Sequence, residues 1–184
     1  ESKPLKFLNY PAVRAMILYP MNALVNDQLG RFRNIFGDKR IKNKFQALTG
    51  RPVRFGRYTG RTLYPGVRSK EKDIQRLKSI NEFYVDIFKR YKNNEPEYVE
   101  LFKKLKELGK WPAKPDIEKW YGTGSWQSID NSFKRCITLD DDSELLTRHE
   151  MFLNPPDLLV TNYFMLEYML IRPIERNIFE QTKK

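Results

Sequence analysis

The chain has 184 residues, 40% of them hydrophobic and 14% aromatic, which suffices for the packed core of one domain, or of one domain with an insertion. A formal net charge of +11 favours a polyanionic partner such as nucleic acid, although basic side chains that merely solvate the surface would give the same total. One cysteine (Cys136) and one histidine (His149) exclude an internal disulfide and an ordinary zinc site, and no apolar run approaches the roughly 18 residues of a membrane span. We therefore expect a soluble, cytoplasmic protein without a membrane partner.

The chain opens with a predicted strand, turn and helix. An apolar run over residues 13–19 is too short for a buried helix and favours a buried strand, which Pro20 ends. Apolar residues then recur at helical spacing up to the predicted helix end at Gly37-Asp38, and these are Val25, Leu29, Phe32 and Phe36. Residues 51–58 form the second predicted strand, in which Val53 and Phe55 alternate with polar neighbours.

The centre of the chain predicts two helices followed by a stretch rich in loops. Residues 69–108 carry apolar side chains at helical spacing, with an interruption at residues 93–96. Residues 109–145 hold prolines, glycines and all three tryptophans, so we expect an ordered excursion rather than a disordered linker. Within it, LDDDSE (residues 139–144) predicts an acidic surface turn.

The last part of the chain repeats the strand-to-helix pattern. Residues 158–160 form a third short apolar strand, and Thr161-Asn162 opens a helix that Arg172-Pro173 ends. Alternation of strands and helices predicts an α/β fold with a parallel sheet covered by helices. We expect residues 1–68 and 146–184 to form the sheet, and residues 69–145 to be a helical and Trp-rich insertion.

Three turns should meet at one end of this sheet, because parallel strands present their carboxyl ends together. The candidate binding residues there are Pro20, Met21, Asn22, Gln28, Thr59, Gly60, Arg61, Thr161, Asn162 and Tyr163. Four arginines should cluster around the second turn, namely Arg51, Arg54, Arg57 and Arg61. Helix N-termini and uncharged hydrogen-bonding groups beside basic residues suit a sugar-phosphate backbone. The alternative is that the polar residues only cap their own helices.

The sequences at these turns resemble one known family. LYPMNALVNDQ (residues 18–28) is similar to LYPMNALANDQ, YTGRT (residues 58–62) to YTGDT, and PPDLLVTNYFMLEYMLIRP (residues 155–173) to PPDILLTNYVMLEYLLLRP. These patterns are typical of the first RecA-like domain of superfamily 2 DEAD/DEAH-box helicases, in particular of large bacterial helicases, several of which occur in phage-defence systems. They correspond to motif Ia, the Thr-Gly turn and motif Ib, and Arg148 and Glu150 also match the family just ahead of the double proline. The resemblance covers roughly residues 1–62 and 148–184, and Arg61 departs from it, since the family usually has Asp there.

The resemblance implies a partial RecA-like (P-loop NTPase-type) sheet whose turns hold the backbone of single-stranded or unwinding DNA, or of RNA. The parent protein would be an ATP-dependent helicase that uses ATP and Mg²⁺. This chain corresponds to the segment between the P-loop and the Asp-Glu-x-His motif, and it contains neither. GTGSW (residues 122–126) lacks the Lys-Ser/Thr of a P-loop, and His149 follows no Asp-Glu pair, so we expect it to be a surface or helix residue. We expect no catalytic residue, no metal-binding residue, no bound cofactor and no ATPase activity in this segment alone, because the remaining parts of the helicase domain would supply them.

Two other classes of function fit the same sequence. A stand-alone nucleic-acid-binding module could keep the sheet and lack the ATPase, and a structural or partner-binding domain could act through its aromatic centre.

Overall fold

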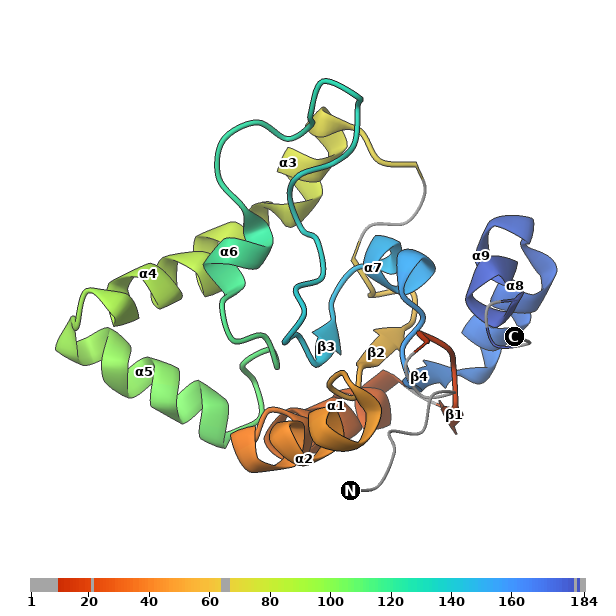
Figure 1. The fold of residues 1–184 in the computed structure, drawn as a ribbon, viewed down its shortest axis with the longest axis horizontal. Helices are drawn as coiled ribbons and strands as arrows, with labels where there is room; N and C mark the ends of the chain where they lie inside the picture. The colour runs from red at the N-terminus through yellow and green to blue at the C-terminus, as the bar shows by residue number, and fades with distance from the viewer. Residues whose placement is uncertain (1–9, 21, 64–66, 181, 183–184) are drawn as a thin grey trace.

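The computed structural model of the chain describes residues 10–20, 22–63, 67–180 and 182, and it has an α/β fold. Over these residues, four parallel strands form one sheet, namely β1 (Ala15–Tyr19), β2 (Phe55–Tyr58), β3 (Glu144–Leu145) and β4 (Leu158–Asn162). Their spatial order is β1-β4-β2-β3, so the last strand in the chain lies inside the sheet. Helices flank this sheet, which confirms the predicted α/β class and is consistent with a partial RecA-like domain (Figure 1).

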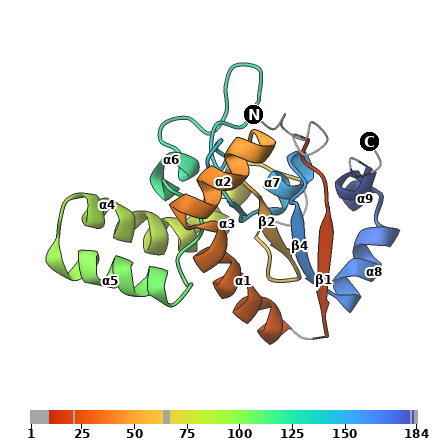
Figure 2. The ribbon, with the colours of Figure 1, turned by 60° about the horizontal axis from the view of Figure 1, so that its bottom comes forward.

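The helices divide into those that cover the sheet and those of the central segment. Those that cover the sheet are α1 (Asn22–Phe36), α2 (Lys39–Thr49), α7 (Arg148–Leu153), α8 (Tyr163–Ile171) and α9 (Pro173–Glu180). Those of the central segment are α3 (Lys70–Ile80), the π-helical turn η2 (Asn81–Val85), α4 (Asp86–Lys92), α5 (Pro96–Glu107) and α6 (Ile117–Tyr121). Figure 2 shows α1 in front of the sheet, α8 and α9 beside β1, and the α4–α5 pair projecting away from the strands.

The two faces of the sheet bury different cores, because successive side chains of a strand point to opposite faces. Phe55 and Val160 pack with Val25, Leu29 and Phe32 of α1 on one face. On the other face, the neighbouring strand residues Tyr58 and Leu159 pack with Met151 of α7, Met169 of α8 and Ile178 of α9. Both faces are therefore covered by helices from this chain. In the described part of the chain, β1 pairs with β4 on one side and with no strand on its other side.

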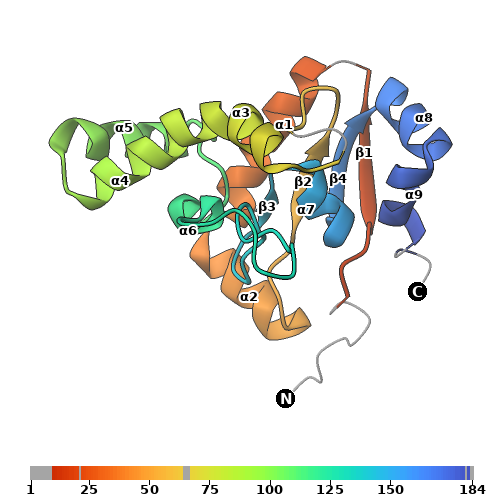
Figure 3. The same cartoon turned by 90° about the horizontal axis from the view of Figure 1, so that it is seen from above.

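The central segment has a hydrophobic core of its own. Trp111, Trp120 and Trp126 are all buried there, together with residues of α3, η2, α4 and α5. Figure 3 shows the same segment beside the sheet rather than on top of it. The division of the chain at residues 69 and 145 stays a prediction, but the last two residues of that block, Glu144 and Leu145, form the unexpected strand β3 and pair with β2.

The sequence predicted an acidic surface turn at residues 139–144, but only part of this run is exposed. Asp140 and Asp141 are exposed, whereas Asp142, Ser143 and Glu144 are buried. Glu144 accepts hydrogen bonds from the Arg33 guanidinium at 2.7 and 2.8 Å and from the Ala113 amide at 2.9 Å. This half of the acidic run therefore binds α1 and the loop before α6 to the edge of the sheet.

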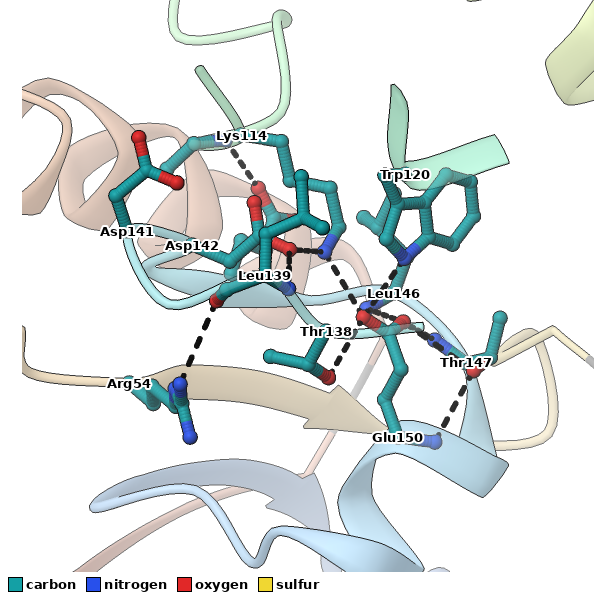
Figure 4. Close-up of polar contacts among 12 residues, drawn as sticks. Arg54, Lys114, Trp120, Thr138, Leu139, Asp141, Asp142, Leu146, Thr147 and Glu150 are labelled. Atoms are coloured by element: carbon teal, nitrogen blue, oxygen red, sulfur yellow. Dashed lines mark hydrogen bonds and ion pairs between the residues drawn. The ribbon is translucent and has the colours of Figure 1, made fainter. Parts of the chain in front are cut away.

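Lys114 forms a second buried ionic contact, which joins the central segment to helix α7 (Figure 4). Its Nζ lies 2.6 Å from Asp142 Oδ2 and 2.8 Å from Glu150 Oε1, and all three side chains are almost fully buried. Glu150 also accepts from Trp120 Nε1 at 2.9 Å and, through Oε2, from the Thr147 amide in the capping box of α7. A buried ammonium held by two carboxylates fixes the central segment in one position, because moving it would leave unpaired charges out of water.

Two element boundaries differ from the prediction. The Gly37-Asp38 pair ends α1 but also starts α2, which the sequence did not predict, because Asp38 Oδ1 accepts from the Arg40 amide at 2.8 Å as an N-cap. The second strand begins at Phe55 rather than at residue 51. Residues 51–54 instead surround the Asp157 carboxylate, which binds the Arg51 guanidinium at 2.6 Å and the Arg54 amide at 2.9 Å.

In the part of the chain that the structure describes, every helix is too short or too polar to cross a membrane.

Candidate nucleic-acid interface

The strand register brings the three predicted turns together at the carboxyl end of the sheet. Tyr19 at the end of β1 lies opposite Asn162 of β4, and Thr161 lies opposite Tyr58 at the end of β2. The turns that follow β1, β2 and β4 therefore leave the sheet at the same end, with the β4 turn between the other two. This is the arrangement that a strand of nucleic acid running across the turns would need.

An amide pair joins the first and third turns. Asn162 is the N-cap of α8, since its Oδ1 accepts from the Met165 amide at 2.8 Å, and its Nδ2 donates to Asn22 Oδ1 at 2.8 Å. Asn22 is the first residue of α1 and is half-buried. Within the described residues, Asn22 Nδ2 has no acceptor, so it is the donor end of this chain of amides. Both asparagines thus have a structural role, and Asn22 also keeps a donor that could reach a phosphate oxygen.

Threonines in the second and third turns are buried and bonded to backbone. Thr161 Oγ1 donates to the Tyr58 carbonyl at 2.6 Å and so ties β4 to β2. The Thr59 amide donates to Thr62 Oγ1 at 2.8 Å, and the Thr59 carbonyl accepts from Arg148 at 3.0 Å. These contacts shape the turns from inside. Direct contact of the Thr59 and Thr161 hydroxyls with a nucleic-acid strand stays a prediction.

The groups at this end that face solvent are fewer than the predicted set. Pro20, Gly60 and Arg61 are exposed, and Tyr163 is 58% exposed at the start of α8. Gln28 lies six residues after Asn22 on α1, where its side-chain oxygen accepts from Tyr19 Oη at 3.3 Å. Met21 lies outside the described residues. Arg61, Tyr163 and the Gly60 backbone therefore present the most accessible hydrogen-bonding groups for a phosphate chain or a stacked base.

The predicted cluster of four arginines is wrong for two of its members. Arg51 lies before β2, and thus at the amino end of the sheet, where it is paired with Asp157. Arg54 is buried, and its guanidinium donates to the Leu139 carbonyl at 3.4 Å. A strand advances about 3.3 Å per residue, so residues along one strand spread over its length instead of gathering at its end. Arg57 and Arg61 remain at the carboxyl end.

Two concave regions adjoin these turns on opposite faces of the sheet. A cavity of about 360 Å³, hereafter the α1 cavity, lies between α1, the end of β2 and the turn after α5, and includes Arg57. A larger cavity of about 540 Å³ lies by α7 and α9, with Phe133, Ile137 and Ile174 in its lining. The larger one is mainly apolar and offers little to a phosphate. Neither cavity could be predicted from the sequence, because the walls of each come from distant parts of the chain.

His149 lies in α7, half-buried, which agrees with the expectation of a helix residue. Burial lowers the pKa of its imidazole to about 4, and the charge of Arg68 acts in the same direction. The ring is therefore neutral at physiological pH.

Comparison with known proteins finds a much longer relative. The chain is 47% identical over 194 residues to Druantia protein DruE of Escherichia coli (strain UMEA 4076-1). The alignment includes 97% of the chain, and the chain spans about 10% of the length of that protein. No family profile matches the chain. The likeness thus concerns nearly all of this chain but a small part of its relative.

Proposed function

We propose that this chain is the strand-gripping segment of an ATP-dependent helicase or translocase motor that acts in phage defence. The shared carboxyl end of the three turns carries this proposal, because the three stretches that resemble helicase sequences are the ones that the fold brings together. The net charge of +11 and the likeness to Druantia protein DruE support it. In the parent protein, ATP and Mg²⁺ would bind to a P-loop and an Asp-Glu-x-His motif outside this segment.

The turns would act mainly through backbone recognition. Asn22 Nδ2, the Gly60 backbone and the Arg61 guanidinium can meet phosphate oxygens, whereas the Tyr163 ring can stack on a base. Such contacts tolerate any base sequence, which a motor that moves along a strand requires. The buried hydroxyls of Thr59 and Thr161 would keep the turns in register as the motor opens and closes.

Binding of single strands tests this proposal in the complete protein that contains the chain. We expect affinity for a labelled oligonucleotide to fall steeply with salt and to change little between base sequences. Arg61→Gln and Tyr163→Ala should each weaken binding several-fold and reduce strand-stimulated ATP hydrolysis. Arg176→Gln on α9, which removes one exposed charge away from the turns, is the matched control. Equal effects of Arg61→Gln and Arg176→Gln would count against the proposal.

ATP hydrolysis separates the motor from the alternatives. The isolated chain should release no phosphate from ATP, and the complete protein should do so only with Mg²⁺ and faster with a single strand. Strand binding without any ATPase activity in the complete protein would favour the stand-alone binding module. Absence of both activities would favour the partner-binding domain.

A further inference from the structure

The α1 cavity lies between the central segment and the carboxyl end of the sheet. Its walls are α1 with Asn26 and Arg33, the end of β2 with Arg57, and the turn after α5 with Gly109 and Lys110. At about 360 Å³ it is large enough for one small ligand or one unit of a longer ligand. Arg57 directly precedes Tyr58 and the Thr59-Gly60 turn, so the cavity begins where the proposed strand path ends.

Arg57 brings an unneutralised charge to this cavity. Its side chain crosses from β2 to α1, where Nη1 donates to Asn26 Oδ1 at 2.6 Å, and it is half-buried. Among the residues that the structure describes, no carboxylate lies within ion-pair distance of it. Burial lowers the pKa of Arg57, the charges of Arg33 and Arg61 lower it further, and Glu144 offsets part of this. A partly desolvated guanidinium bonded to one neutral amide is a strong site for an anion.

The other charges around the cavity leave a positive excess. Arg33 is neutralised by Glu144 at 2.7 Å, and Asp27 pairs with Arg31 at 3.1 Å. Lys110 is exposed, and in the described part of the chain its ammonium has no acidic partner. Among the described residues that line the cavity, Arg57 and Lys110 are therefore the two cations free to bind a ligand, and the Asp27 carboxylate disfavours an anion at that side of the cavity.

The central segment is held rigidly at this wall. Gly109 has a positive φ of 63°, and a Cβ at that position would lie 2.5 Å from the Gly30 carbonyl oxygen, so the turn touches the backbone of α1 directly. The Tyr84 hydroxyl of η2 donates to the Lys110 carbonyl at 3.2 Å. Lys110 therefore takes its position from the core of the central segment, not from a loose loop.

We propose that the α1 cavity holds one phosphate-bearing unit of the bound nucleic-acid strand, between Arg57 of the sheet and Lys110 of the central segment. This inference rests on the proposed function and extends it, because the central segment then contributes to binding of the nucleic-acid strand. The strand would pass from the three turns into the cavity along the side of α1, with the phosphate at Arg57 and away from Asp27.

The test measures binding of a labelled oligothymidylate to the complete protein over a series of salt concentrations. Arg57→Gln and Lys110→Gln each remove one cavity cation, and Lys103→Gln removes one exposed cation from α5 outside the cavity. We expect each cavity variant to weaken binding about tenfold and to reduce the salt slope by roughly 0.7, the value for one phosphate contact on a single strand. Lys103→Gln should leave both values within error of the wild type.

Further arms separate the outcomes. If Arg57→Gln lowers the melting temperature markedly, Lys110→Gln decides, because Lys110 is exposed and its replacement disturbs no packing. If Arg61→Gln weakens binding but both cavity variants match Lys103→Gln, the cavity proposal is overturned and the proposed function stands. If the wild-type protein binds no strand, both fail. A mononucleotide that binds to the wild type but not to Arg57→Gln, at matched ionic strength and without competing with the strand, would assign the cavity to a free nucleotide and overturn the strand assignment.

Discussion

Replacement of Lys114 by Met should destabilise the chain far more than replacement of any exposed lysine. The change leaves the carboxylates of Asp142 and Glu150 buried and facing each other, with Lys114, Asp142 and Glu150 side chains 0%, 0% and 1% exposed. Removal of one partner from a buried ion pair costs about 3–5 kcal/mol of unfolding free energy, and here two carboxylates lose their partner.

Lys92 provides a matched control. It also bridges two carboxylates, Asp116 at 3.3 Å and Glu118 at 3.2 Å, but its side chain is 44% exposed. Exposed pairs contribute about 0–1 kcal/mol, so Lys92→Met should have a small effect. The two variants remove the same group from similar pairs, and they differ in burial.

The assay is urea unfolding followed by tryptophan fluorescence, because all three tryptophans lie in the core of the central segment and Trp120 donates to Glu150. Burial already raises the pKa of Asp142 in the presence of Lys114. Without the lysine this pKa should rise further, so the folded variant takes up a proton as the pH falls. The deficit of Lys114→Met should therefore be largest at neutral pH and shrink towards pH 5. Equal losses for Lys114→Met and Lys92→Met, or a deficit independent of pH, would refute the reasoning.

Three further changes probe other parts of the fold. Gly109→Ala should lower the unfolding free energy by at least about 1–2 kcal/mol, because Gly109 has a positive φ and contacts α1. Gly30→Ala, whose new Cβ would meet its nearest neighbour at 3.6 Å, should be neutral or stabilise α1 by up to about 1 kcal/mol. Thermal unfolding of both variants checks this, and the opposite ranking would contradict the glycine contact. His149→Gln should reduce the loss of stability between pH 6.5 and about 4, because the folded imidazole stays neutral there while the unfolded chain binds the proton. If the melting temperatures of the wild type and the variant fall equally over this range, burial does not hold the ring neutral. Asn162→Ala should lower the unfolding free energy by about 0.5–2 kcal/mol through loss of the α8 cap, as measured by urea titration, and an unchanged midpoint would mean that the cap contributes nothing.

Local patterns in the sequence sufficed for the parts of the fold that depend on neighbours in the chain. The strand-to-helix units at residues 15–36 and 158–171 have a period and end signals that fix their type, and the meeting of three turns at one end of the sheet followed from them. Strand β3 has two residues, too few for any period to appear, and Asp38 can end one helix and begin the next with the same side chain. Neither strand β3 nor the start of α2 at Asp38 could be predicted from residue spacing alone.

The features that the sequence did not predict have a common cause in long-range contacts. Acidic residues are usually exposed, so the sequence LDDDSE predicted a surface turn, but Lys114 lies 28 positions before Asp142 and makes burial of that carboxylate acceptable. In the same way, nothing near Thr161 shows that its hydroxyl turns inward to a carbonyl 103 residues away. The proposed role of Arg57 depends on the lack of an acidic partner among the described residues, which only the assembled fold reveals.

The position of β4 in the sheet determines when the chain can fold during its synthesis. β4 pairs with β1 across 143 positions, as from Ala15 to Leu158. It also lies between β1 and β2 in the sheet, so β1 cannot join the other strands before β4 is present. Until residues 158–162 leave the ribosome, the β1 strand has no partner strand among the described residues, whereas the helices of the central segment can already close their own local core. Sheet formation then closes a loop that contains an ordered unit, which lowers the entropy still to be lost compared with a flexible loop of equal length. A nascent chain of which only the residues before 158 have left the ribosome should thus hold a folded central segment and an unpaired β1, and β1 should become protected from proteolysis once the residues up to the end of α8 have left the ribosome.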